Sequence, residues 1–290
     1  MSSITPASLF SAEGMVCFVT GGGSGVGLTI TEALVAGGAA KVYIGGRRRA
    51  VLDAAVTRIG KPDVVIPVSV DVTSVDALRE AAAFVARDSG YLNLLVCNAG
   101  IGGPQVEPPK EGISAAEWAE KHLAQGIDEY TQTFAVNVSS VWFTTMAFLG
   151  LLELGTKKRN VTQTSSVIVI SSIAGYNKVC TGGWAYGQSK AGATHVVKHL
   201  SLILPQWGIR SNFICPGLFP SDMSAPIIEK HGIANGDNAL PTSMVPMGRM
   251  GDSMDMAGAV LYLASRAGAY CHGTGLVLDG GRLCTFSSTY

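Results

Sequence analysis

The sequence predicts an α/β fold in which a doubly wound parallel sheet carries helices on both faces. Two observations predict it. Short apolar runs rich in β-branched residues alternate along the chain with longer alanine-rich segments of helical period. Each run is also nearly continuous rather than alternating with polar residues, as expected for strands buried on both faces of a parallel sheet. The predicted strands are 15–20, 41–44, 64–70, 92–97, 167–171, 209–214 and 276–278, and the predicted helices are 25–37, 48–59, 74–88, 127–154, 184–204 and 253–265.

The composition favours a single domain that binds a small molecule. The 290 residues are 47% apolar and 14% charged, and the 21 Lys and Arg residues balance the 21 Asp and Glu residues. A neutral chain has no electrostatic footprint for nucleic acid or an anionic membrane. The most apolar helical stretch, 141–154, is too short to span a bilayer and carries Glu153. Because the six cysteines show no paired spacing and the first residues do not resemble a signal peptide, we expect a reducing, cytoplasmic location.

Two long irregular segments interrupt the alternation of strands and helices. Residues 101–126 are rich in Gly, Pro and charge before a short predicted helix at 114–124, and residues 216–250 are rich in Pro and Gly. Both follow strand ends at the predicted carboxyl edge of the sheet, where ligands bind in this architecture. We interpret the first as an enlarged loop and the second as a substrate lid, with idle surface insertions as the alternative.

A glycine-rich turn follows the first predicted strand and opens the first helix. Its glycines allow the backbone to approach a pyrophosphate, and the free N–H groups of the helix start would hold the phosphate charge. A glycine-rich turn without a ligand is the alternative, which the position between strand and helix disfavours. The residues that would contact a dinucleotide here are Gly21, Gly23, Ser24, Gly25, Val26 and Gly27.

The end of the second strand indicates which dinucleotide binds. Sites that prefer NAD place a carboxylate there, whereas this chain has Arg47 and Arg48. A guanidinium can hold a 2′-phosphate through bidentate, charge-assisted bonds. The alternative is a solvated basic loop, although cations at a helix start oppose the helix dipole and so favour an anionic partner. We therefore predict NADP(H), with Arg47 as the main contact.

Two further strand ends carry residues that suit the same pocket. Asp71 and Val72 follow the third strand and would lie at the adenine edge, and Asn98, Ala99 and Gly100 follow the fourth, where small residues let the cofactor ribose pass. Each could instead be ordinary capping or turn chemistry, Asp71 in particular. Their recurrence at successive strand ends favours the cofactor interpretation.

The candidate chemistry lies on the helix predicted at 184–204. Tyr186 and Lys190 are four residues apart and therefore face one side of it. A tyrosine has an unperturbed pKa of about 10, and a nearby ammonium would lower that pKa toward neutrality and make the hydroxyl a useful acid or base. The alternative is a helix with one buried tyrosine and one exposed lysine.

Two other polar residues complete the candidate set. Ser172 ends the fifth strand and could hydrogen-bond a substrate carbonyl. Ser171 is the adjacent alternative, but strand alternation sends it to the opposite face. Asn137 lies inside the predicted helix 127–154, where asparagine is disfavoured, so it satisfies a polar site or is simply exposed.

Together, these motifs resemble the short-chain dehydrogenases/reductases over nearly the whole chain. They are TGGGSGVG at 20–27, Asp71, NAG at 98–100, Asn137, Ser172, YGQSK at 186–190, PGLFPSDM at 216–223, VPMGRMGDSMDMAGAVLYLAS at 245–265 and GTGLVLDGG at 273–281. The resemblance is to 3-oxoacyl-carrier-protein reductases and the ketoreductases of secondary metabolism. It implies one Rossmann domain with a seven-stranded sheet, in a homodimer or homotetramer.

The resemblance also implies roles. Tyr186 would protonate the carbonyl, Lys190 would hold the nicotinamide ribose, and Asn137 would hold a water of the proton relay. Three departures from the family pattern are Cys97 before Asn98, a longer stretch before Asn137, and one extra residue between Ser172 and Tyr186. The nicotinamide and its carboxamide would lie against Pro216, Gly217, Leu218, Phe219 and Ser221.

The sequence therefore predicts an NADPH-dependent reductase of a bulky, hydrophobic ketone of polyketide-like or aromatic type. The alternatives are a repurposed scaffold for imine reduction, isomerisation or cyclisation, and a non-catalytic NADP sensor. No metal is expected, since His195 and His199 share a helix face without a third ligand. The mostly apolar residues predicted to line the substrate pocket, any of which could instead be core, are Ile173, Ala174, Tyr176, Cys180, Trp184, Leu218, Phe219 and Met223.

Overall fold

Seven parallel strands form one sheet in the order β3-β2-β1-β4-β5-β6-β7 in the computed structural model, which describes residues 4–180, 182–225, 229 and 239–290. This confirms the predicted doubly wound sheet. The chain moves outward from β1 in one direction and then from β4 in the other, which leaves a crevice at the carboxyl ends of β1 and β4. The strands are β1 (Val16–Thr20), β2 (Lys41–Gly46), β3 (Val65–Ser69), β4 (Leu94–Cys97), β5 (Ser166–Ile170), β6 (Arg210–Pro216) and β7 (Gly275–Leu278).

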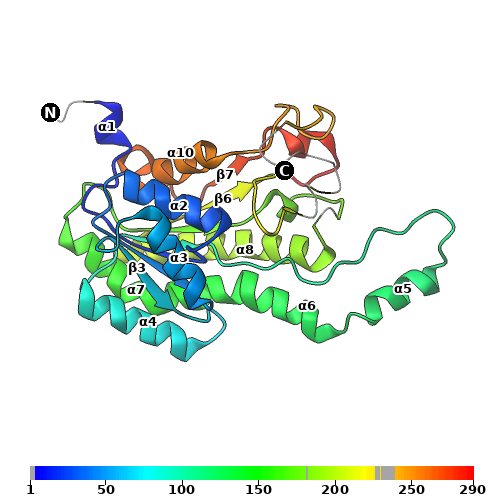
Figure 1. Cartoon of the computed structure of the whole chain (residues 1–290), viewed down its shortest axis with the longest axis horizontal. Helices are drawn as coiled ribbons and strands as arrows, with labels where there is room; N and C mark the ends of the chain where they lie inside the picture. The colour runs from blue at the N-terminus through cyan, green and yellow to red at the C-terminus, as the bar shows by residue number, and fades with distance from the viewer. Residues whose placement is uncertain (1–3, 181, 226–228, 230–238) are drawn as a thin grey trace.

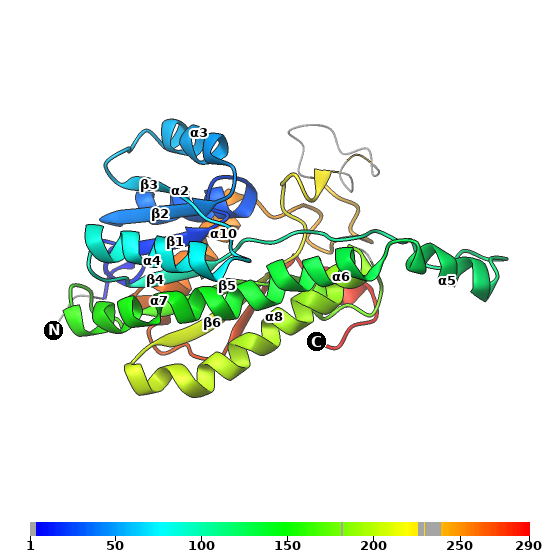
Figure 2. The same cartoon turned by 90° about the horizontal axis from the view of Figure 1, so that it is seen from below.

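Successive side chains of each strand point to opposite faces of the sheet, so each face carries an apolar core that helices cover. Val16 and Phe18 of β1 belong to one core, and Cys17 and Val19 between them belong to the other. The second core is covered by α2 (Gly25–Ala36), α3 (Arg49–Ile59) and α10 (Ser253–Ala264), and the first by α4 (Val75–Asp88), α7 (Ser140–Lys158) and α8 (Trp184–Ile203) (Figures 1 and 2).

The helix predicted at 127–154 is longer and less regular than expected. It consists of α6 (Ile127–Phe134), a π-helical turn (Ala135–Ser139) that contains Asn137, and α7. The helix spans Ile127–Lys158 and contains an 18-residue window of mean hydropathy 1.5, so by length and composition alone it could cross a bilayer, and the expectation of too short a stretch was wrong. Phe148 and Leu152 are nevertheless fully buried in the core, as in the central helix of a globular domain.

The segment 101–126 extends away from the sheet. Its helix α5 (Ala115–Leu123), close to the predicted 114–124, contains no buried residue and reaches outward from the body in both views (Figures 1 and 2). Of the predicted lid 216–250, residues 226–228 and 230–238 lie outside the described residues. Leu240, Val245 and Met250, which follow, form a small apolar cluster of their own.

The remaining short elements join these parts. The carboxyl-terminal segment runs beside the residues after β5, where Thr289 N donates to Tyr176 O at 2.8 Å and Lys178 N donates to Ser287 O at 2.9 Å. The short elements are α1 (Pro6–Leu9) and 3₁₀ turns at Ile173–Gly175, Leu204–Trp207, Arg266–Gly268 and Arg282–Thr285.

Candidate active site

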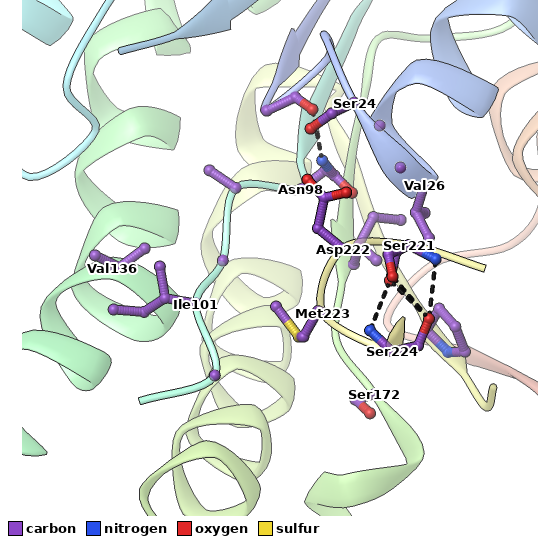
Figure 3. Close-up of a pocket in the computed structure, with 18 of the residues that line it drawn as sticks. Ser24, Val26, Asn98, Ile101, Val136, Ser172, Ser221, Asp222, Met223 and Ser224 are labelled. Carbon is purple, nitrogen blue, oxygen red and sulfur yellow. Dashed lines mark hydrogen bonds between the residues drawn. The ribbon is translucent and has the colours of Figure 1, made fainter. Parts of the chain in front are cut away.

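One cavity of about 730 Å³ lies at the carboxyl ends of the strands. It brings together segments that are far apart in the sequence. Figure 3 shows Ile101 and Val136 across the opening from Ser221 and Ser224, with Met223 between them. All residues predicted to bind the cofactor line it: Gly21, Gly23, Ser24, Gly25, Val26, Gly27, Arg47, Arg48, Asp71, Val72, Asn98, Ala99, Gly100, Tyr186, Lys190, Pro216, Gly217, Leu218, Phe219 and Ser221.

The backbone of the glycine-rich turn packs so closely on itself that side chains would not fit at some of its positions. Gly21 has φ of +67°, and a Cβ on Gly27 would lie 2.1 Å from the carbonyl oxygen of Gly21. Ser24 precedes α2 but its side chain does not cap the helix. The first amides of α2 therefore remain available at the wall of the cavity, and uncapped amides at a helix start suit a phosphate.

Asn98 joins the end of β4 to this turn. Its Nδ2 donates to Thr20 O at 2.9 Å, and its backbone N donates to Thr20 Oγ1 at 2.9 Å. Ala99 N donates to the same Oγ1 at 3.0 Å. The two strand ends are thus held at a fixed spacing, and Asn98 serves as a structural clamp as well as part of the cavity wall.

Exposed arginines stand at the β2 end of the cavity. Arg47 and Arg48 precede α3, and Arg48 does not cap it. Arg49 does not line the cavity and instead pairs with Asp53 at 2.9 Å. Asp71 lines the cavity and also stabilises the turn after β3, the alternative role considered for it, since its Oδ1 accepts from the backbone N and the hydroxyl of Thr73. Those Thr73 bonds, and then the charge of Arg47, lower the pKa of the Asp71 carboxyl.

Lys190 is buried, so the alternative of an exposed lysine was wrong. Only 4% of it is exposed, and its Nζ donates to Ile170 O at 2.8 Å. Burial without a carboxylate partner penalises the ammonium and lowers the pKa of Lys190 to about 8. Lys190 lies one turn after Tyr186, with Nζ 5.7 Å from the centre of the tyrosine ring.

The expected lowering of the Tyr186 pKa is not found in this structure. Burial raises the pKa of Tyr186, the Ser172 hydroxyl lowers it, and the Cys215 thiol raises it. The desolvation of the phenol therefore outweighs the hydrogen bond from Ser172, and Nζ of Lys190 is directed to the carbonyl of Ile170 instead of to the phenol. Tyr186 is therefore a protonated group at neutral pH, which suits a proton donor.

Ser171 and Ser172 both line the cavity, but their hydroxyls have different partners. The Ser171 hydroxyl donates to Lys190 O at 2.9 Å and contacts Thr194 Oγ1 at 3.0 Å, so it is engaged by α8. The Ser172 hydroxyl lies at the cavity wall, where it accepts from Ala174 N at 3.1 Å and hydrogen-bonds the side chain of Tyr186. Ser172 is thus the better placed of the two to contact a substrate.

Asn137 satisfies a buried polar site, one of the two possibilities left by the sequence. It is 1% exposed and is not part of the cavity wall. Its Oδ1 accepts from Ile101 N, and its Nδ2 donates to Ile101 O and to Ser189 Oγ, each at 2.9 Å. Ser189 Oγ in turn donates to Tyr186 O at 2.8 Å. Asn137 therefore fixes the backbone on two sides of Tyr186.

Three of the predicted pocket residues do not line the cavity. Trp184 precedes Tyr186 by two residues, or about 200° around a helix, so it points away; its Nε1 donates to Val106 O at 3.0 Å. Tyr176 packs its ring against Tyr290. Cys180 also lies outside the wall. The other predicted pocket residues do line it: Ile173, Ala174, Leu218, Phe219 and Met223.

The sequence did not identify several wall residues of the substrate end. Gln105 bridges two loops, since its Nε2 donates to Gly103 O at 3.1 Å and to Gly182 O at 3.2 Å. Arg282 directly follows the motif GTGLVLDGG at 273–281, and no helical or strand periodicity in the sequence indicated that it would reach the cavity. The described wall residues that were missed include Ile101, Gly102, Gln105, Val136, Asp222, Ser224 and Arg282.

Comparison with known proteins agrees with this geometry. A family model described as Enoyl-(Acyl carrier protein) reductase matches residues 21–282. Short-chain dehydrogenase/reductase PhomF of Diaporthe leptostromiformis is 41% identical over 293 residues, covering 100% of this chain and 99% of its own. The rhamnolipids biosynthesis 3-oxoacyl-(acyl-carrier-protein) reductase of Pseudomonas aeruginosa is 31% identical over 274 residues, covering 94% of this chain and 97% of its own.

A solved structure matches over a similar range. The active-site complex of Pseudomonas aeruginosa RhlG with NADP superposes with a TM-score of 0.77 and 28% identity, covering 94% of this chain and 98% of that one. The sheet order, the glycine-rich turn and the tyrosine–lysine pair agree with this relationship. The chain therefore belongs to the short-chain dehydrogenase/reductase family and is an oxidoreductase.

Proposed function

We propose that the protein reduces a hydrophobic ketone to a secondary alcohol with NADPH, using Tyr186 as the general acid. One observation carries the proposal: Tyr186, Lys190 and Ser172 meet in the same cavity as the glycine-rich turn. One cavity thus contains both the N-terminus of α2, which suits a phosphate, and a proton donor. Bound NADPH supplies the hydride.

The side chains then have distinct tasks. Ser172 donates a hydrogen bond to the carbonyl oxygen, and Tyr186 transfers its proton to that oxygen as negative charge develops. Lys190 holds the nicotinamide ribose, and its charge stabilises the phenolate that Tyr186 leaves behind. Asn137 acts as a positioning residue, because it holds Ile101 and Ser189 beside the tyrosine. A water held by Asn137 stays a prediction.

Two features support NADPH over NADH. Arg47 and Arg48 are exposed at the wall of the cavity, and Arg47 is close enough to act on the charge of Asp71. A 2′-phosphate beside the start of α3 would neutralise cations that otherwise oppose the helix dipole. The RhlG relative was solved with NADP, which is consistent with the proposal.

The wall of the other half favours a hydrophobic substrate. Apolar side chains line it from three directions: the segment after β4, the turn after β5, and the segment after β6. Of the predicted lid 216–250, the described residues Leu218, Phe219 and Met223 line this half. The apolar side chains are Ile101, Val136, Ile173, Leu218, Phe219 and Met223.

Replacement of Tyr186 by Phe tests the proposal. With a panel of aromatic and aliphatic ketones, kcat should fall by about 10²–10⁴-fold because the acid is lost. The NADPH dissociation constant, measured by NADPH fluorescence, should stay within about twofold, since the ring remains. Retained turnover would remove Tyr186 from the mechanism. Consumption of a substrate without oxidation of NADPH would instead indicate isomerisation or cyclisation.

A further inference from the structure

A buried arginine, Arg282, lines the cavity on the β7 side of the sheet, whereas Arg47 lies on the β2 side. Arg282 follows β7, whose Leu278 is paired with Pro216 of β6, so it stands beyond the strand that leads into Leu218. Only 8% of it is exposed, yet it lines the cavity. Five strand spacings of about 4.8 Å separate β2 from β7, or roughly 24 Å. Arg282 is thus on the substrate side of the site.

Arg282 uses only part of its hydrogen-bonding capacity. Its Nη1 donates to Met244 O at 3.2 Å, and the guanidinium lies 5.6 Å from the centre of the Phe286 ring. Nε and Nη2 donate to none of the residues described. The structural arginine Arg210 differs, because its Nη1 and Nη2 donate to the carbonyl oxygens of Leu263, Gly268, Cys271 and Thr164.

The charge of Arg282 is also poorly compensated. Among the residues that the structure describes, no carboxylate forms an ion pair with it. Asp279 is near enough to favour the charged form, but its two oxygens accept from Gly281 N and Leu283 N, each at 2.8 Å. A buried charge without a partner is costly, so an anion at this end of the cavity would be stabilised.

We propose that Arg282 determines substrate specificity by binding a carboxylate on the ketone, so that the substrate is a keto acid with an apolar body. The free Nε–Nη2 edge of a guanidinium matches a carboxylate through two parallel hydrogen bonds. The apolar residues that line the same cavity as Tyr186 and Arg282 accommodate the body of such a molecule, and its ketone lies at Tyr186. This inference rests on the proposed function, which it deepens.

A series of keto acids of increasing length tests the inference. The acids are 4-oxopentanoate, 6-oxoheptanoate, 8-oxononanoate and 4-acetylbenzoate, and each is compared in kcat/KM with its own methyl ester. The wild-type protein should prefer the best acid by about 10–100-fold, the value of a charged hydrogen bond of roughly 1.5–3 kcal/mol. In Arg282→Met the preference should fall to about one while ester turnover is retained. The chain length of the best acid reports the distance from Tyr186 to Arg282.

Two further variants control for charge and folding. Arg282→Lys keeps the charge without the planar fork and should keep a smaller preference. Arg266→Met removes an exposed arginine outside the cavity and should leave the preference unchanged. If Arg282→Met does not fold, Arg282→Lys carries the test.

Binding separates this inference from the proposed function. In protein saturated with NADP⁺, the best acid should raise the melting temperature and its ester should not, and Arg282→Met should abolish the shift. Such a shift without any oxidation of NADPH would sink the reductase proposal and leave the role of Arg282 intact. Equal turnover of acids and esters, or acids that neither bind nor react better than esters, overturns the role of Arg282. Weakened NADPH binding in Arg282→Met would assign the residue to the cofactor instead.

Discussion

The two halves of the cavity are built in different ways. The half that we propose to hold the nucleotide, called the nucleotide half, is formed by residues directly after β1, β2, β3 and β4, and hydrogen bonds between neighbouring strand ends, such as those of Asn98 to Thr20, hold it together. The substrate half combines residues close to the ends of β5 and β6 with loop residues far from their own strands. Gln105 of one such loop bonds to Gly182 of another.

This difference separates what strand register fixes from what tertiary contacts fix. In the nucleotide half, one or two residues after a strand cannot move far, so their position follows from the sheet. In the substrate half, the wall depends on where loops of many residues settle against each other. Substitutions in the first half should therefore act on all substrates equally, whereas those in the second should act on some substrates only.

Within the nucleotide half, the largest effect is expected for Gly27→Ala. The new Cβ would lie 2.1 Å from Gly21 O and 2.5 Å from Asn98 Nδ2, both held by the turn. Relieving the overlap must shift the phosphate-binding backbone, at a cost of roughly 1–3 kcal/mol or more. The affinity for NADPH, measured by fluorescence, should fall by about 100-fold, and every substrate should be affected alike.

Gly150→Ala is the matched control for this change. Gly150 is also helical, in α7, and a Cβ there meets nothing within 4 Å. The free energy of unfolding should rise by roughly 0.5–1 kcal/mol, since alanine loses less entropy on folding. Cofactor affinity should not change. Normal NADPH binding by Gly27→Ala would show that the turn does not hold the phosphates.

A smaller, selective effect is expected for Arg47→Gln. Loss of charge-assisted bonds to the 2′-phosphate, worth roughly 1.5–3 kcal/mol, should lower kcat/KM with NADPH by about 30-fold. The value with NADH should hardly change. Arg49→Gln is the control, because Arg49 pairs with Asp53 outside the cavity. If Arg47→Gln lowered kcat/KM with NADPH and with NADH equally, Arg47 would not bind the 2′-phosphate.

The sequence predicted the nucleotide half well for a physical reason. Strand patterning gave the sheet, and each candidate there was placed by its distance from a strand end, as with Asp71 after β3. The pairing of Tyr186 with Lys190 could also be predicted from the sequence, because helical periodicity puts residues four apart on one side of a helix. What periodicity could not give was the burial of Lys190 or the raised pKa of Tyr186, which depend on the packing of α8 against β5.

The misses fall in the substrate half. Cys180 and Trp184 were predicted to line the substrate pocket but do not line the cavity, and Nε1 of Trp184 donates to Val106 O in the segment 101–126. Arg282 was missed because it reaches the site only through the pairing of β7 with β6. Long-range pairings of this kind leave no local pattern in a single sequence.

The smallest predicted effect is a pH dependence of cofactor affinity that originates at Lys190. The pKa of Lys190 is about 8, so the ammonium is present below pH 8 and is lost as the pH rises through it. The charged form donates stronger bonds to the ribose hydroxyls. The dissociation constant of NADPH should therefore be flat from pH 7 to 8 and then increase, by up to about tenfold per pH unit.

Binding above pH 8 should also take up a proton, because the charged form of Lys190 is the one that binds. The pKa of Tyr186 is raised by burial, so this phenol stays neutral across pH 7–9.5 and does not contribute. Lys190→Met should bind NADPH more weakly, with no break near pH 8. Lys198→Met, which removes an exposed lysine of the same helix, should keep the break. If the NADPH dissociation constant of Lys190→Met still increased above pH 8, the titrating group would be a residue other than Lys190.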